Sequence, residues 1–212
     1  MSQEHLKSKN APLLWLFIGV NFAAFLSVVV AKQLTGSSIE HFWQHVSAKD
    51  GLFALCTPLA TIVLNGALGE LTKARLVFWR WQDPLPGCRA FSQLVGRDPR
   101  IDVPALKAKH GALPLDPNEQ NALWYRIYKK HRESITAVEA HRAYLLTRDM
   151  AALSAIFFVV FSVGVLIAMV GSNIAVMYSG ILIAQYLIIS TAARSYGTRF
   201  VLNVLTEESH TR

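Results

Sequence analysis

Four long apolar segments most constrain how this chain can fold. They come in two pairs, and the residues between the pairs carry most of the charge. A bilayer core of about 30 Å is crossed by about 20 helical residues, so apolar segments of this length are read as membrane spans. The sequence therefore predicts an all-α, polytopic membrane protein with four transmembrane helices and a helical cytoplasmic insert between the second and third.

The second predicted span is the least apolar of the four, because it carries Pro58, Asn65 and Gly66. A core helix of a soluble domain is the alternative interpretation of this segment. The predicted spans cover residues 12–31, 51–69, 150–170 and 173–193. The segments that connect and follow them are an external loop with an interfacial helix at 32–50, a cytoplasmic helical domain at 70–149 and a cytoplasmic tail at 194–212.

The distribution of positive charge predicts the orientation. Of the 21 Lys and Arg residues, only Lys32 and Lys49 lie outside the N-terminal segment, the insert and the tail. An excess of Lys and Arg beside the spans marks the cytoplasmic side of a membrane. We therefore expect a multi-pass protein of a bacterial inner membrane with both termini and the insert in the cytoplasm. This cytoplasmic excess of Lys and Arg accounts for most of the net charge of +7. The net charge is therefore weak evidence for a nucleic-acid partner.

Within the insert, the sequence Asp116-Pro117-Asn118-Glu119 is the strongest local signal. Asp at the cap, Pro at the first helical position and Glu at the third position are typical of a helix start. Because no Pro or Gly follows until Gly164, one helix is predicted to run from Pro117 towards the third span. The run 129–134 is where a bend would disturb packing least. An unbroken helix would couple the insert mechanically to the membrane.

Shorter helices are expected earlier in the insert. The second span is predicted to continue through Leu71 to Trp81, and a short helix is predicted from Cys88 to Val95. Another helix is predicted to begin after Asp102, which is a suitable N-cap, and to end at Gly111.

One basic and aromatic patch is the candidate site for a ligand or partner. Positive side chains alternate there with aromatic ones, as in sites that bind phosphate groups. A solvated face with its aromatic residues packed on the short helices is the simpler interpretation; an acidic protein, a nucleotide or a nucleic acid are the alternative partners. The residues of this patch are Arg126, Lys129, Lys130, Arg132, Trp124 and Tyr125.

A second candidate feature is a polar stripe in the second span. Thr57, Thr61 and Asn65 recur every four residues, and such residues either hydrogen-bond between packed helices or line a pore. Asn21 and Gln185 are predicted to be similar polar partners from other spans. Since the spans contain no ionisable acid, base or histidine, proton-coupled transport lacks its usual carriers.

Three groups of residues resemble sites that carry chemistry. Glu139 lies near His141 and His131 in the sequence, but residues two positions apart point to different faces of a helix. Arg126 and His131 match the R-x4-H spacing and so resemble the active motif of HEPN-type ribonucleases, but Ile127 departs from that motif and chance accounts for the match. His41 and His45 have the four-residue spacing of a helical metal site, but a third ligand is missing. We therefore expect no catalytic residue, metal or cofactor, and no enzyme.

Three strings carry a family resemblance: Leu85-Pro86-Gly87-Cys88-Arg89-Ala90-Phe91, Asp98-Pro99-Arg100-Ile101-Asp102 and Gln120-Asn121-Ala122-Leu123-Trp124-Tyr125. They resemble a family of small, uncharacterised bacterial membrane proteins with four helices. The resemblance covers the insert and carries no known chemistry. The plan also resembles, in architecture alone, small membrane subunits of bacterial antiphage systems, in which a cytosolic sensor gates membrane damage.

These observations predict a non-enzymatic, homo-oligomeric membrane protein. Its insert would receive a cytoplasmic protein or a ligand and relay that event to the spans, as an effector or pore-like subunit does. A passive membrane anchor or assembly subunit is the first alternative, and a membrane-tethered HEPN-like ribonuclease is the second.

Overall fold

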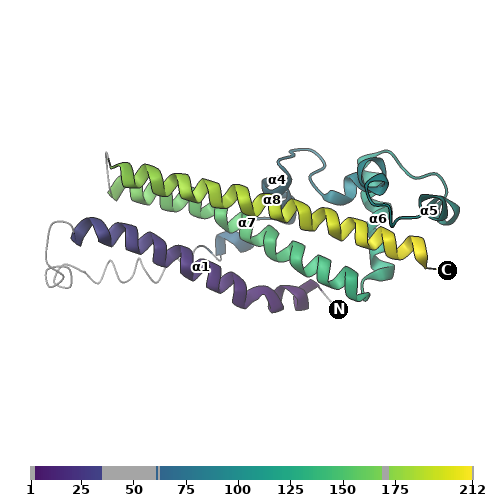
Figure 1. Ribbon diagram of the computed structural model, residues 1–212, viewed down its shortest axis with the longest axis horizontal. Coiled ribbons are helices and arrows are strands. Elements are labelled where there is room, and N and C mark those ends of the chain that lie inside the picture. Colours follow the sequence, from purple (N-terminus) through teal and green to yellow (C-terminus); the bar gives the residue numbers. More distant parts are fainter. Residues whose placement is uncertain (1–2, 35–60, 62, 169–171, 212) are drawn as a thin grey trace. The chain divides into compact units, whose positions relative to one another are not determined.

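A computed structural model of the protein describes residues 3–34, 61, 63–168 and 172–211. The expectation of an all-α fold is confirmed for these residues, which contain no strand. The elements, labelled as in Figure 1, are α1 (Gln3–Leu34), α4 (Glu70–Phe78), η1 (Pro86–Arg89), η2 (Ala90–Leu94), η3 (Val95–Arg97), α5 (Val103–His110), α6 (Pro117–His131), α7 (Ile135–Ala168) and α8 (Asn173–His210).

The chain forms two compact units, each with its own core. The first, here called the helical domain, comprises Met1–Asn10, Glu70–Arg148 and Ser190–Arg212. The second, here called the apolar unit, comprises Ala11–Gly69 and Asp149–Ile189. The boundary falls inside α7 and inside α8, so both helices contribute residues to both units.

The apolar unit is built around aromatic side chains from α1 and α7. Phe161 stacks on Phe25 with ring centroids 4.7 Å apart and on Phe157 at 5.0 Å. Gly164 lets the Phe25 ring approach, since a Cβ there would lie 3.3 Å from it. Other large apolar side chains stay exposed, including Ile167 at 73%. A helix that is apolar on its outer face as well is typical of a membrane span.

Three described helices are long and apolar enough to cross a membrane: Ser8–Val29, Ile135–Ile167 and Asn173–His210. They contain most of the first and third predicted spans and all of the fourth. The second predicted span, 51–69, lies mostly outside the described residues, although residues 63–67 at its end are helical. The described part of the chain therefore supplies three candidate spans, where four were predicted for the whole chain.

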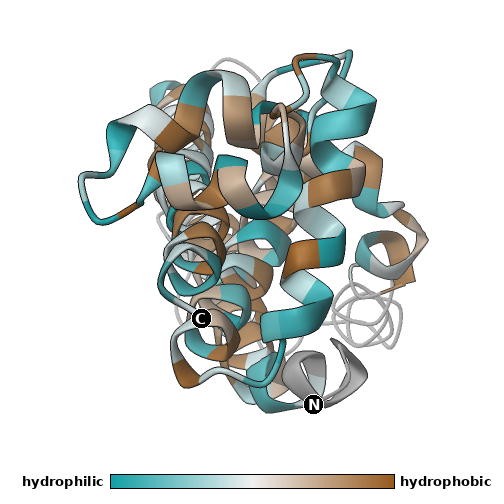
Figure 2. Cartoon of the chain, turned by 90° about the vertical axis from the view of Figure 1, so that its right-hand side faces the viewer, coloured by the Kyte–Doolittle hydropathy of each residue, from teal (hydrophilic) through white to brown (hydrophobic). Residues whose placement is uncertain are grey.

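The core of the helical domain includes residues from the segment 194–212, which was predicted to form a tail. α8 continues to His210, and its last turns bury Phe200, Val201, Val204 and Leu205 in the domain core. These positions follow the spacing of one apolar helix face. Residues 194–210, which were expected to belong to a cytoplasmic tail, thus form the end of α8 and contribute to the domain core, because this apolar stripe needs a partner surface. Figure 2, seen from the side of the C-terminus, shows hydrophilic and hydrophobic residues mixed along the helices.

The long helix predicted from Pro117 into the third span is interrupted. α6 ends at His131 and α7 begins at Ile135, inside the run where a bend was expected to disturb packing least. Ser134 stabilises the new start, because its hydroxyl accepts a hydrogen bond from the Ala137 backbone N–H at 3.2 Å. The helix that contains the third candidate span therefore begins at Ile135.

The predicted helix starts at Asp102 and Asp116 are confirmed. The Asp102 carboxylate accepts a hydrogen bond from the backbone N–H of Ala105, and the Asp116 carboxylate accepts from Asn118 and Glu119. Such caps satisfy N–H groups that have no partner within the helix.

The predicted helix from Cys88 to Val95 is a 3-10 turn followed by a π-helical turn. A buried side chain from α6 fixes this geometry. The Gln120 amide oxygen accepts from the backbone N–H groups of Phe91 and Ser92, both at 3.0 Å, and its NH₂ group donates to the Leu115 carbonyl at 2.7 Å.

The helix predicted through Trp81 as a continuation of the second span is a separate element. Leu68 and Gly69 are not helical, and α4 then runs only from Glu70 to Phe78. Trp79 ends it with a φ of 53°, because the left-handed region cannot continue a right-handed helix.

Candidate functional site

Aromatic side chains of the helical domain surround a cavity of about 330 Å³, here called the aromatic pocket. A cavity of this size falls at the lower end of the range for small-molecule sites. Its wall comes from α4, η1, α6, α7 and α8, and includes Trp124, Tyr125, Tyr128, His141, Arg148 and Phe200.

Four of these rings contact one another in a defined arrangement. Trp124 and Tyr128 lie nearly parallel, at 9° with centroids 5.8 Å apart, and Phe200 meets both edge-on at 5.2 Å. His141 stacks on Phe200 with centroids 4.6 Å apart. These contacts join α6, α7 and α8, so the pocket has rigid aromatic walls drawn from three helices.

Polar groups occupy a few defined positions in the wall. The Tyr128 hydroxyl lies 2.9 Å from His141 Nδ1. Burial, and then the neighbouring Tyr125, raise the pKa of Tyr128, so its hydroxyl keeps its proton at neutral pH. Arg148 is only 4% exposed and lies 3.8 Å from the Glu70 carboxylate. A few polar groups among aromatic ones are typical of a site that orients a small ligand.

The indole N–H of Trp124 is buried and has no hydrogen-bond partner in the described part of the chain. Buried donors are nearly always satisfied, so an exception calls for an explanation. The ring itself is fixed against Gly87, where an added Cβ would lie 2.8 Å from Trp124 Cε3. An acceptor on a bound ligand would explain the unused donor.

A second site is centred on Glu208, which is 1% exposed in the last turn of α8. His110 Nε2 lies 3.1 Å from its Oε1, Lys130 Nζ lies 2.9 Å from its Oε2, and His131 Nε2 hydrogen-bonds to Oε2. The Lys109 ammonium donates to the Glu208 backbone carbonyl at 2.6 Å. These contacts attach the end of α8 to α5 and α6.

The ionisation of Glu208 is set by these neighbours. Burial alone would raise the pKa of the carboxyl, but hydrogen bonds from His131, Lys130 and His110 outweigh burial and lower the pKa to about 2. The carboxylate is therefore charged at neutral pH. A cavity of about 400 Å³ beside it, here called the basic pocket, is lined by Lys109, His110, Leu123, Arg126, Ile127, Lys130 and Glu208.

The residues of the predicted basic and aromatic patch lie on different faces of α6. Trp124 and Tyr125 line the aromatic pocket, whereas Arg126 and Lys130 line the basic pocket. Lys129 Nζ lies over the Tyr125 ring, 4.8 Å from its centroid. Arg132 is exposed and pairs loosely with Glu133 at 3.7 Å. The predicted patch is therefore divided between two separate pockets, and its other two residues, Lys129 and Arg132, are exposed to solvent.

Arg126 and His131, the two residues of the predicted ribonuclease motif, both lie at the site around Glu208. Arg126 lines the basic pocket, but His131 is not among the residues of its wall, and His131 Nε2 is bonded to Glu208. Among the described residues, no group of three or more His, Cys, Asp or Glu side chains is arranged to hold a metal ion. His41 and His45 lie outside the described residues.

The polar stripe of the second span is only partly described. Thr57 lies outside the described residues, Thr61 is 3% exposed, and Asn65 Oδ1 is buried without a hydrogen-bond partner among them. The expected role of Asn21 and Gln185 as polar partners is confirmed, because Gln185 Nε2 donates to Asn21 Oδ1 at 3.0 Å. This bond joins α1 to α8 within the apolar unit.

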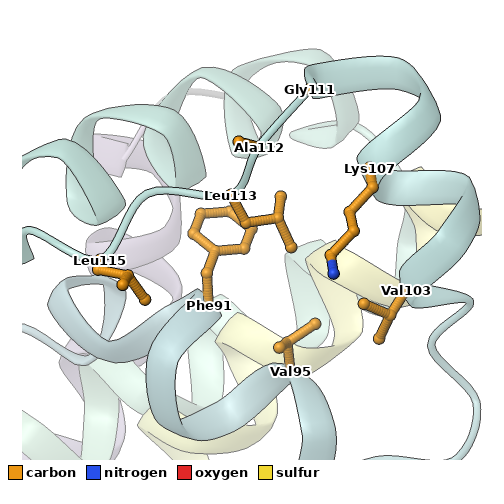
Figure 3. Close-up of a pocket in the computed structure, with 8 residues that line it drawn as sticks. All are labelled: Phe91, Val95, Val103, Lys107, Gly111, Ala112, Leu113 and Leu115. Carbon is orange, nitrogen blue, oxygen red and sulfur yellow. The ribbon is translucent and has the colours of Figure 1, made fainter.

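A third cavity, of about 540 Å³, lies between α5, the η helices and the loop before α6. Figure 3 shows its apolar side chains, including Phe91, Val95 and Leu113, around an open space that the Lys107 side chain enters from α5. Nothing in its wall supplies a second charged group, so it offers little to orient a ligand.

Sequence reasoning gave no functional role to Glu208, His110 or His141. Glu208 was assigned to a tail, although the apolar spacing of Phe200 and Val204 before it marks a packed helix face. The two histidines have no local motif, because their partners lie far away in the sequence. Comparisons of the chain with protein-family models, curated proteins and solved structures find no match.

Proposed function

We propose that this chain is a non-enzymatic, oligomeric protein of a bacterial inner membrane whose helical domain binds a small ligand in the aromatic pocket. Binding is relayed through α7 and α8 to the membrane helices, as in an effector or pore-like subunit. One observation carries the proposal: the pocket is lined by residues of α7 and α8, and both helices continue into candidate membrane spans.

The physical basis of the relay is the wall of the pocket. His141 and Arg148 come from α7, Phe200 comes from α8, and Trp124 comes from α6. A ligand that contacts all three helices favours the arrangement in which they fit it best. It shifts the protein towards that arrangement by the difference in its affinity for the two states. A shift between α7 and α8 then reaches the apolar unit without a further joint, since each is one continuous helix.

The test is dye release from vesicles that contain the purified protein. The vesicles are exposed to the small-molecule fraction of a bacterial extract, because the ligand is not identified. We expect release with the natural protein and a loss of at least about tenfold in its rate with His141→Ala, which removes a ring from the wall and a hydrogen bond from Tyr128. Glu139→Ala, an exposed change on the same helix, is the matched control.

Vesicles that stay tight with folded, inserted protein would count against the relay. A stable complex with another protein and no release would favour the alternative of a passive anchor. The ribonuclease alternative requires RNA cleavage that is lost in both Arg126→Ala and His131→Ala. The bond from His131 to Glu208 gives that alternative less support.

A further inference from the structure

We propose that the basic pocket binds a phosphate group, held by Arg126, Lys130 and Lys109. The site is separate from the aromatic pocket and does not depend on the relay. All three cations line one cavity of about 400 Å³, with Glu208 in the same wall. The cavity is larger than a phosphate ion, so it also admits a phosphate monoester of a small molecule.

Arg126 supplies the main contact for the ligand. Its side chain is exposed on α6, and no hydrogen bond or ion pair joins it to any residue that the structure describes. A guanidinium carries five N–H donors in a planar fork. That fork matches two oxygens of a phosphate, which is why arginine is common in phosphate sites.

The two lysines keep donors for a ligand while their positions are fixed. An ammonium has three N–H donors. Lys109 uses two of them on the backbone carbonyls of Glu208 and Thr211. Lys130 Nζ lies 3.0 Å from Glu208 Oε1 and 2.9 Å from Oε2. Each ammonium therefore retains one donor, and neither side chain has to be ordered when the ligand binds.

The charge of the pocket favours an anion. Lys109, Arg126 and Lys130 face a single carboxylate, and that carboxylate is already bonded to Lys130, His110 and His131. One negative charge does not neutralise three positive ones, whereas an added phosphate does. Glu208 thus acts as a positioning residue that holds the cations in place, and it does not itself contact the ligand.

Two cations close to Arg126 lie outside the pocket, and one of them serves as a matched control of the same charge. Lys129 lies over the Tyr125 ring and Arg132 pairs with Glu133, and neither lines the basic pocket. Arg126→Gln and Lys129→Gln each remove one positive charge from an exposed position on the same helix. They therefore separate a defined site from a diffuse positive surface.

The experiment is calorimetric titration of the detergent-solubilised full chain at constant ionic strength. The probes are inorganic phosphate, AMP and a single-stranded RNA of about 20 nucleotides. We expect saturable binding of phosphate or AMP, with the dissociation constant raised at least about tenfold in Arg126→Gln and less than about twofold in Lys129→Gln. Equal affinity for phosphate and AMP would show recognition of the phosphate alone, and tighter AMP binding would show that the rest of an ester is also contacted.

Three results would overturn the proposal. These are no saturable binding of phosphate or AMP, equal weakening in the two variants, and binding of RNA alone. Circular dichroism and the melting temperature of Arg126→Gln verify that the variant is folded. If vesicles that contain the protein release no dye, the proposed relay is contradicted. The phosphate titration is unaffected by that result, because it needs no membrane.

Discussion

At the scale of single residues, the Glu208 carboxylate joins the end of α8 to α5 and α6. A carboxylate that is 1% exposed is costly to bury unless its oxygens are hydrogen-bonded and its charge is paired. Two histidines and a lysine from α5 and α6 meet both conditions. The carboxylate therefore stabilises the fold only together with these partners, and removal of its charge leaves the mostly buried rings of His110 and His131 without a charged partner.

Glu208→Gln should lower the free energy of unfolding by about 3 kcal/mol at neutral pH, because the native pKa of about 2 lies well below the ordinary value of 4.5. A lowered pKa gives stability that is present above the unfolded value and is lost as the pH falls towards the native value. The natural protein should therefore lose this stability between about pH 5 and pH 2, and the variant should lack that part of the pH dependence.

Thermal unfolding in detergent as a function of pH measures both effects. Glu139→Gln, at an exposed position on α7, is the control and should follow the natural protein. A Glu208→Gln curve that parallels the natural one through the acidic range would contradict the assigned pKa.

At the scale of elements, Gln120 explains why the short helix of the insert is not an α-helix. A 3-10 turn followed by a π-helical turn directs the N–H groups of Phe91 and Ser92 at one amide oxygen from α6. This arrangement places Gly87 directly against Trp124. The irregular segment therefore forms one wall of the aromatic pocket, and its conformation depends on a side chain about 30 residues away in sequence.

Gln120→Leu should lower the free energy of unfolding by about 2 kcal/mol, since it keeps the volume but leaves the buried N–H of Phe91 and the partly buried N–H of Ser92 without an acceptor. Gln93→Leu makes the same replacement at an exposed position of the π-helical turn and should change stability by less than about 0.5 kcal/mol. Denaturation followed by tryptophan fluorescence provides the measurement. Equal effects of the two changes would argue against the role given to the Gln120 amide.

At the scale of the whole molecule, the charge distribution and the apolar helices together predict how the chain is oriented in a membrane. The basic insert and the two termini should share one side of the membrane, opposite the start of α8 at Asn173. Glu70–Arg148 and Ser190–Arg212 belong to the same compact unit, which is compatible with this expectation.

Single cysteines report this topology. Glu133→Cys, at a side chain that is 73% exposed, should react with a membrane-impermeant maleimide only after cells are opened. Asn173→Cys, exposed at the start of α8, should react in intact spheroplasts. The natural protein measures the background from Cys56 and the buried Cys88. Labelling of Glu133→Cys in intact spheroplasts would reverse the predicted orientation.

The sequence by itself determined what depends on local chain chemistry. Helix starts at Asp102 and Asp116 were predictable, because a cap acts on N–H groups two or three residues away. The long apolar segments were predictable as well, since length and composition alone identify a candidate span. The polar pair Asn21 and Gln185 could be singled out, because each polar residue within an apolar span needs a partner.

Only the tertiary structure decided what depends on distant residues. In the folded chain the helix is interrupted between His131 and Ile135, and the end of α8 packs in the domain core. The tertiary structure divided the basic and aromatic patch between two pockets and joined Glu208 to histidines 77 and 98 positions away. The physical reason is that burial and charge pairing are properties of the packed chain. A carboxylate near the end of a sequence carries no local mark of the cations that folding brings to it.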